Sequence, residues 1–274
     1  MSVNEKKLKE AAENGRVEEL WSVLRDNPGL NINWADNKNQ WTALHFASMF
    51  GRFEVVKVLL AHPGINVNSK NRLGQIPFSF GCLKGQVSVV CVLLKDPRVN
   101  VTMADNNGCT PLWEASCFGH HEVVEWLIAS GRDLGDIKNS KGKWDGKDYT
   151  ALEIAKEDEE TEETEIVALL ERFIDNPAQT RHEIRVKLRV LAALAAEVFA
   201  LTVFLCDDLL QLKPAATSLP AARFFTIATK LPIELQMILC HRAVGSAKDD
   251  SILSIDSEAA FKALATILLR SQSK

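Results

Sequence analysis

A repeat with a period of 34 residues is the feature that most constrains how this chain can fold. The segment LLAHPGINVN at 59–68 recurs as LLKDPRVNVT at 93–102, and more loosely as VLRDNPGLNIN at 23–33. The same shift relates TALHFASMFGRFEVV at 42–56 to IPFSFGCLKGQVSVV at 76–90 and to TPLWEASCFGHHEVV at 110–124. A period of this length is typical of proteins in which each copy is one supersecondary unit.

Each copy contains two short helical patterns separated by a glycine. Leu44 and Ala47 fall on one face of a first helix, and Val55, Val56, Leu59 and Leu60 form the apolar stripe of a second. Gly51, Gly85 and Gly119 stand between the two patterns, where a residue able to adopt positive φ is expected after a helix end. Helices this short are not stable alone, so the copies are predicted to stack side by side as a solenoid with polar turns between them.

These motifs resemble the ankyrin-repeat family. TALHFA with Gly51, TPLWEA with Gly119 and the following VV and NVN segments carry the resemblance. It implies a β-turn finger and two antiparallel helices in each copy, and a histidine at His45 that forms hydrogen bonds between neighbouring fingers. We therefore predict an ankyrin-repeat domain over 1–174 with about five repeats. The outer copies depart from the pattern, and a longer finger, NSKGKWDGKDY, leaves the geometry of 138–165 open.

The period stops after residue 174, and we predict a helical capping region or domain over 175–274. Helical patterns occur at about 180–213, 219–230, 232–244 and 256–270, so the predicted fold class is all-α: an α-solenoid with short β-turn fingers plus an all-helical C-terminal region. The apolar run at 190–206 is short for a membrane span and contains Glu197 near its middle, which favours a buried helix.

Composition and motifs argue against several other functions. A formal charge of −4 provides no overall basic footprint for nucleic acid. The polar N-terminus lacks the apolar segment of a secretory signal, which favours a cytoplasmic protein, with the nucleus as an alternative. Phosphate-binding loops, nucleophile elbows and HExxH motifs are missing from the sequence, so we expect no cofactor and no catalytic site. His120 and His121 are adjacent and point in different directions on a helix, which disfavours a shared metal.

Six cysteines occur without CxxC pairs. They are Cys82, Cys91, Cys109, Cys117, Cys206 and Cys240. Their apolar or mixed surroundings predict buried free thiols in a reducing compartment. The run EDEETEETE at 157–165 has seven acidic residues and is interpreted first as a solvated loop inserted in a repeat, with a contact to a basic partner as the alternative.

The resemblance also implies where a partner would bind. In each ankyrin repeat the positions between the small residues of the first helix and the glycine face a concave groove, together with one finger residue. The predicted partner-binding residues are Trp41, Met49, Phe50, Leu83, Lys84, Cys117 and Phe118, with Gln75 and Cys109 at the matching finger positions. An exposed patch rich in such side chains usually marks a binding site, although the C-terminal helices or the curved stack could bury it instead.

The main functional prediction is a non-catalytic module or scaffold that binds another protein in this groove. The alternative rests on LPIELQMILCHR at 231–242, which resembles the start of an F-box and would make the chain a substrate adaptor of a ubiquitin ligase. That segment is apolar on two sides, which favours an inner helix of the C-terminal region instead. An enzyme using Asp207, Asp208, Glu234 and His241 is the weakest alternative, because a polar helix end explains these residues.

Overall fold

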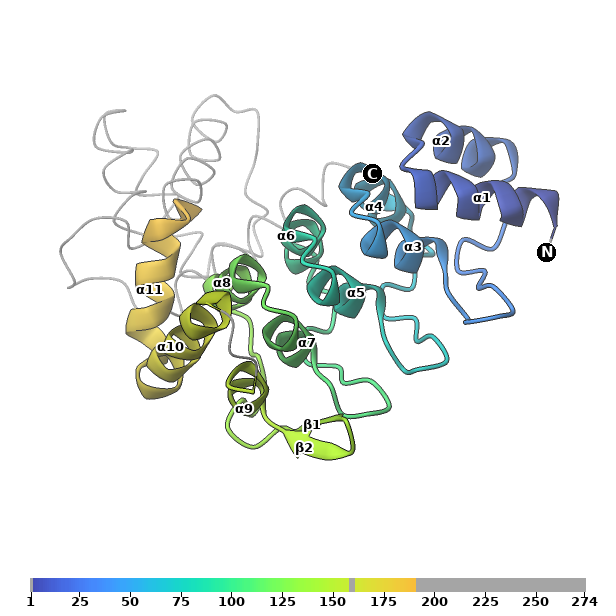
Figure 1. Cartoon of the computed structure of the whole chain (residues 1–274). Coiled ribbons are helices and arrows are strands. Elements are labelled where there is room, and N and C mark those ends of the chain that lie inside the picture. Colours follow the sequence, from blue (N-terminus) through green and yellow to red (C-terminus); the bar gives the residue numbers. More distant parts are fainter. Residues whose placement is uncertain (1, 158–160, 191–274) are drawn as a thin grey trace, which may run out of the picture. The chain divides into compact units, whose positions relative to one another are not determined.

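The computed structural model describes residues 2–157 and 161–190 (Figure 1). By its internal contacts the chain divides into two compact units, residues 1–181 and 182–274. The helices are α1 (Val3–Asn14), α2 (Val17–Asp26), α3 (Ala43–Met49), α4 (Phe53–Ala61), α5 (Pro77–Leu83), α6 (Val87–Leu94), α7 (Pro111–Cys117), α8 (His121–Ala129), α9 (Ala151–Ala155), α10 (Thr161–Asp175) and α11 (Pro177–Lys187). The strands are β1 (Gly142–Trp144) and β2 (Lys147–Tyr149).

The first unit is a stack of five helix pairs in two rows, which confirms the predicted solenoid. The inner helices α1, α3, α5, α7 and α9 contact one another in succession, and the outer helices α2, α4, α6, α8 and α10 do the same (Figure 1). Leu44, Ala47, Val55, Val56 and Leu59 are all completely buried, as the periodicity predicts, whereas Leu60 of the same stripe is half-buried. Because each pair buries its apolar face against its neighbours, stability depends on contacts between adjacent repeats.

The inner helices begin and end at residues that the sequence marks. Thr42, Thr110 and Thr150 each accept a hydrogen bond from the backbone amide three residues ahead, which caps α3, α7 and α9. Gly51 and Gly85 follow the C-terminal ends of α3 and α5 with φ of 70° and 63°, which confirms their predicted role.

Glycine is also needed at these turns because side chains from the next repeat pack against it. These side chains form a ladder of hydrogen bonds along the stack. Arg52 donates from Nε to the carbonyl oxygen of Glu13, Gln86 from Nε2 to that of Met49, and His120 from Nε2 to that of Leu83, at 2.9, 3.3 and 3.0 Å. The His120 ring lies over Gly85, where an added Cβ would come within 2.7 Å of Nδ1. The ladder therefore gives His120 a structural role.

The fingers are joined by backbone hydrogen bonds. The amide of Arg72 donates to the carbonyl of Asn39 at 3.0 Å, and that of Asn106 donates to the carbonyl of Leu73 at 2.9 Å. Within the fingers, Asp36 and Asp105 accept hydrogen bonds from the turn amides that follow them. The second and third fingers are thus each joined to the finger before them.

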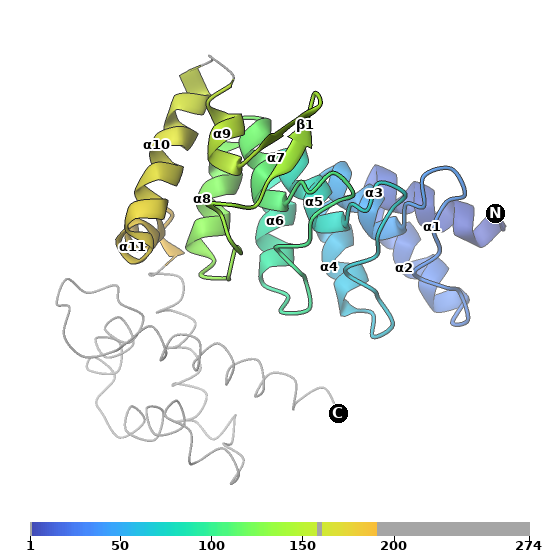
Figure 2. The ribbon, with the colours of Figure 1, turned by 90° about the horizontal axis from the view of Figure 1, so that it is seen from below.

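The longer finger forms a β-hairpin that lies beside α7 and α9 (Figure 2). Gly142 pairs with Tyr149, Lys143 with Asp148, and Trp144 with Lys147. The connecting residues Asp145 and Gly146 both have positive φ, 47° and 77°, as a two-residue hairpin turn requires. The amide of Lys143 donates to the carbonyl of Asn107 at 2.9 Å, so the extra residues extend the finger without breaking the row.

Two predictions near the end of the solenoid are corrected. Residues 161–165 of the acidic run belong to α10, so this part of the run is helical rather than a loop. The pattern at 180–213 predicts one helix, but α11 starts at Pro177, where Asn176 accepts a hydrogen bond from the amide of Gln179, and ends at Lys187. Arg189 has a φ of 55°, which a continuing α-helix cannot contain.

Several predictions lie outside the described residues. These are the helices beyond residue 190, the apolar run at 190–206, the F-box-like segment 231–242, Cys206 and Cys240. The proposed catalytic residues Asp207, Asp208, Glu234 and His241 lie there too. Among the residues that the structure does describe, no helix is both long and apolar enough to cross a bilayer.

Candidate functional site

The candidate partner-binding residues gather at the C-terminal ends of three neighbouring inner helices. Met49, Leu83 and Cys117 are the last residues of α3, α5 and α7, and Phe50, Lys84 and Phe118 are the C-caps that follow them. The first three are half-buried, whereas Phe50, Lys84 and Phe118 are exposed, with 39% of Phe50 and 43% of Phe118 accessible. We call these six residues, with Trp41 and Trp144, the inner face.

Trp41 lies apart from the helix ends, in an aromatic cluster. Its ring centroid is 5.2 Å from that of Phe46 on α3 and 4.7 Å from that of Phe80 on α5, the second in an edge-to-face arrangement. The ammonium group of Lys9 lies 4.8 Å from the centre of the Phe46 ring. Trp41 is half-buried, and its ring packs the first finger against α3 and α5.

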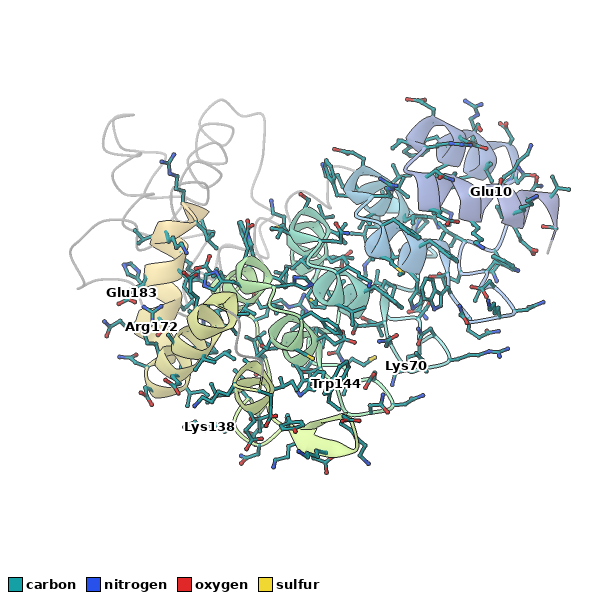
Figure 3. All side chains as sticks on the ribbon, in the orientation of Figure 1. Glu10, Lys70, Lys138, Trp144, Arg172 and Glu183 are labelled. Atoms are coloured by element: carbon teal, nitrogen blue, oxygen red, sulfur yellow. The ribbon has the colours of Figure 1, made fainter. Side chains whose placement is uncertain are left out.

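Trp144 is an exposed aromatic residue that the sequence analysis missed. Its ring lies edge-to-face with Phe118 at 5.9 Å and tilted against Trp113 at 6.3 Å, while 47% of the side chain stays accessible. Figure 3 shows Trp144 on the side of the hairpin that faces α7. An Asp-Gly pair between two short alternating segments is typical of a β-hairpin and could have indicated this one. The comparison of repeats did not reveal it, because no other repeat has a finger of this length.

His45 makes the bond between fingers that the family resemblance implies. The amide of Thr42 donates to His45 Nδ1 at 3.1 Å, so the ring proton lies on Nε2, which donates to the carbonyl of Gln75 at 3.2 Å. Burial is the main cause that lowers the pKa of His45 to about 4, against the hydrogen bond to Gln75, which raises it. The imidazole is therefore neutral and structural.

The two following repeats place other residues at this position. Ser79 replaces the histidine in α5, and its buried hydroxyl has no hydrogen-bond partner. In α7 the position is taken by Trp113, whose Nε1 donates to the carbonyl of Tyr149 at 2.8 Å. The indole thus makes the same bond as the imidazole, despite the longer fourth finger.

Glu114 is a buried carboxyl group one residue beyond Trp113. Gln75 donates from Nε2 to Glu114 Oε1 at 3.1 Å, but Oε2 has no hydrogen-bond partner and the residue is 2% exposed. Burial is the largest cause that raises its pKa to about 8; Asp105 adds to the rise, and Gln75 and the nearby Ser79 oppose it. Glu114 is therefore mainly protonated at neutral pH.

The four cysteines of the described residues only partly match the prediction of buried thiols. Cys82 and Cys109 are buried, but Cys91 and Cys117 are only partly buried. Burial raises the pKa of Cys109 to about 12 and that of Cys91 to about 11, so these thiols are protonated at neutral pH. Cys109 also does not present a finger side chain to the surface, because it packs beneath Gly142 of the hairpin.

A cavity of 480 Å³ lies at the turns that follow Lys84 and Phe118, between the paired helices. It is lined by Gly85, Val87, Gly119, His120, His121, Glu122, Val123 and Glu165. His121 Nε2 is 3.8 Å from a carboxylate oxygen of Glu125 and 3.7 Å from one of Glu165. Within residues 2–157 and 161–190, no group of three His, Cys, Asp or Glu side chains has the arrangement of a metal site.

Comparison with known families agrees with this architecture. A family model described as ankyrin repeats (many copies) matches residues 8–60 and 47–94, and one described as ankyrin repeats (3 copies) matches residues 78–179. The chain belongs to the ankyrin-repeat family. Comparison with curated proteins gives no match. Ankyrin repeats are generally protein–protein interaction modules and are typically non-catalytic, which directs attention to the surface of the stack.

Proposed function

We propose that this ankyrin-repeat protein is a non-catalytic module that binds a segment of another protein on its inner face. The observation that carries the proposal is the exposure of Phe50 and Phe118, at 39% and 43%, at corresponding ends of two inner helices. Large aromatic side chains that stay accessible beside a packed core are typical of binding surfaces, where they act as anchors.

The backbone beneath these anchors is held in place. The amides of Phe50 and Phe118 donate to the carbonyls of Phe46 and Glu114 at 3.0 and 3.2 Å, which extends the hydrogen bonding of α3 and α7 by one residue. The half-buried Met49, Leu83 and Cys117 lie beside them. A surface that is already ordered loses little conformational entropy on binding, which favours affinity.

The proposed partner is a protein, and neither nucleic acid nor a cofactor is part of the proposal. We place the protein in the cytoplasm, with the nucleus as the alternative, and keep residues 175–274 as a capping region or domain. The adaptor hypothesis remains a prediction, because residues 231–242 lie outside the described residues and no observation on the repeats favours it.

Site-specific crosslinking tests the proposal. A photoreactive phenylalanine analogue is placed at Phe50 or Phe118 in the full chain, and at Trp21, which is 51% exposed on the outer helix α2, as the matched control. We expect a protein adduct from positions 50 and 118 that is lost when Met49→Ser is added without a change in melting temperature. Adducts that form equally from position 21, or that survive the substitution, would contradict the inner face as the binding surface.

A further inference from the structure

The hairpin and α7 together present an exposed aromatic pair. Phe118 and Trp144 meet edge-to-face at 5.9 Å, yet each keeps more than two fifths of its surface accessible. Trp113 lies behind Trp144 and is almost completely buried. The buried Trp113 therefore supports the pair on one side, and the exposed surface of the pair remains accessible, as an anchor site for one apolar side chain requires.

The hairpin register determines which charges surround this pair. Trp144 lies directly opposite Lys147, so both side chains are on the face of the hairpin that meets α7. Lys143 and Asp148 form the next pair and point to the other face, because side chains alternate along a strand. On the face that carries Trp144, the charge contributed by the strands is therefore a lysine.

The neighbouring inner helix contributes a second cation. Lys84 is the exposed C-cap of α5 and corresponds to Phe118 in the next repeat, and packed helices lie about 10 Å apart. Of the described residues, none forms an ion pair with Lys84 or Lys147. Glu114 of α7 is buried and mainly protonated, so it does not offset these cations. The exposed carboxyl group of Asp145 lies in the hairpin turn, not on the strands that carry Trp144 and Lys147.

The positive surface has a boundary on one side. Glu157 is exposed just beyond the C-terminal end of α9, in the repeat that follows Phe118, and it opens the acidic run. A negatively charged ligand is repelled there and attracted toward α5 and the hairpin. The exposed C-cap of α9, Lys156, also lies on that side, but Glu171 pairs with it at 2.7 Å and offsets its charge, unlike the charges of Lys84 and Lys147.

We propose, building on the function proposed above, that the partner segment is acidic and extended, with one apolar side chain seated on the Phe118–Trp144 pair and its carboxylates directed to Lys84 and Lys147. The aromatic pair supplies most of the affinity. The lysines select an acidic sequence and accelerate association at low salt. This role makes the hairpin, which has no counterpart in the other four repeats, a determinant of specificity.

Peptide selection on the full chain tests this assignment. Random dodecapeptides displayed on phage are selected against the immobilised protein at pH 7, and enriched sequences are synthesised with their acidic residues intact or replaced by amides. We expect enrichment of Asp and Glu beside one Leu, Ile, Phe or Trp, and about a tenfold or larger loss of affinity for the amide forms, growing weaker as salt is added.

Matched variants locate the binding site. Trp144→Ala and the double variant Lys84→Glu/Lys147→Glu should each weaken binding of the acidic peptide about tenfold or more, whereas Trp21→Ala and Lys7→Glu/Lys95→Glu, which change exposed residues elsewhere, should not. Because Trp144 touches Trp113, melting temperatures are compared for all variants. If Trp144→Ala lowers the melting temperature, the peptide affinity of the Lys84→Glu/Lys147→Glu variant decides the test.

The outcomes separate the two proposals. Peptides that bind through Phe50 and Phe118 but are neutral or basic, or that ignore the lysine substitutions, would overturn the acidic partner and leave the inner face as the binding surface. Peptides that bind without any dependence on the inner face, or a selection that yields no binder, would overturn both.

Discussion

Two neighbouring junctions between inner helices differ in how their buried polar side chains are hydrogen-bonded. Between α3 and α5, the neutral His45 ring spans from Thr42 to the carbonyl of Gln75 and satisfies both of its nitrogen atoms. Between α5 and α7, Ser79 stands at the corresponding position, and the buried Glu114 leaves one carboxyl oxygen without a hydrogen bond. The backbone frame is the same, but the polar atoms of His45 are fully hydrogen-bonded and those of Glu114 are not.

The turn side of the same helices behaves differently. There Arg52, Gln86 and His120, three unlike side chains, make the same bond to the preceding repeat. These residues lie at the surface, where length and charge can vary. The finger side is buried, so the chemistry of the side chain decides whether the bond forms.

The two junctions should therefore respond to pH in opposite directions, and Glu114 has the larger effect. Its folded pKa of about 8 exceeds its ordinary value of 4.5, so its contribution to stability is complete below pH 4.5 and is lost as pH rises through 8. Glu114→Gln should remove this loss and raise the free energy of unfolding by on the order of 3 kcal/mol at pH 7, with little change at pH 4.5. Denaturant unfolding across this pH range measures it.

A matched control is Glu18→Gln, which changes an exposed carboxyl group on α2. Its unfolding free energies should follow those of the parent protein at every pH. Parallel curves for Glu114→Gln and the parent would show that Glu114 ionises without cost.

His45 should act in the acid range. Its folded pKa of about 4 lies below the ordinary 6.5, so its contribution is present above pH 6.5 and is lost as pH falls through 4. In the Glu114→Gln background, unfolding free energy should fall by about 3 kcal/mol between pH 6.5 and 4. The His45 imidazole signal in NMR spectra, assigned by comparison with His45→Gln, should titrate near pH 4. A midpoint near 6.5 would refute a buried neutral ring.

The smallest expected effect belongs to the turn side. Gly85→Ala introduces a Cβ at φ 63° and places it 2.7 Å from His120 Nδ1, which should cost about 1–3 kcal/mol. Gly29→Ala is the control, since its added Cβ would meet nothing within 4 Å. Equal melting temperatures for the two variants would show that the His120 bond moves aside freely.

Much of the fold follows from local patterns in the chain. The threonine caps, the glycines with positive φ and the apolar residues at helical spacing each act within a few residues, so one copy predicts the next. The same reasoning predicts the inner-face positions Phe50, Lys84 and Phe118, because they occupy corresponding places in the repeat. Trp144 was not, because it lies in a finger that no other copy shares.

The sequence alone determined the period, and with it the helix pairs, the order of stacking and the row of side chains at the helix ends. Only the tertiary structure decided that Cys109 lies beneath the hairpin, that Glu114 is buried beside Gln75, and that Trp144 rests against Phe118. The physical reason is distance along the chain: periodicity and capping depend on adjacent residues, whereas burial and ring contacts arise between residues that only the stacking of repeats brings together.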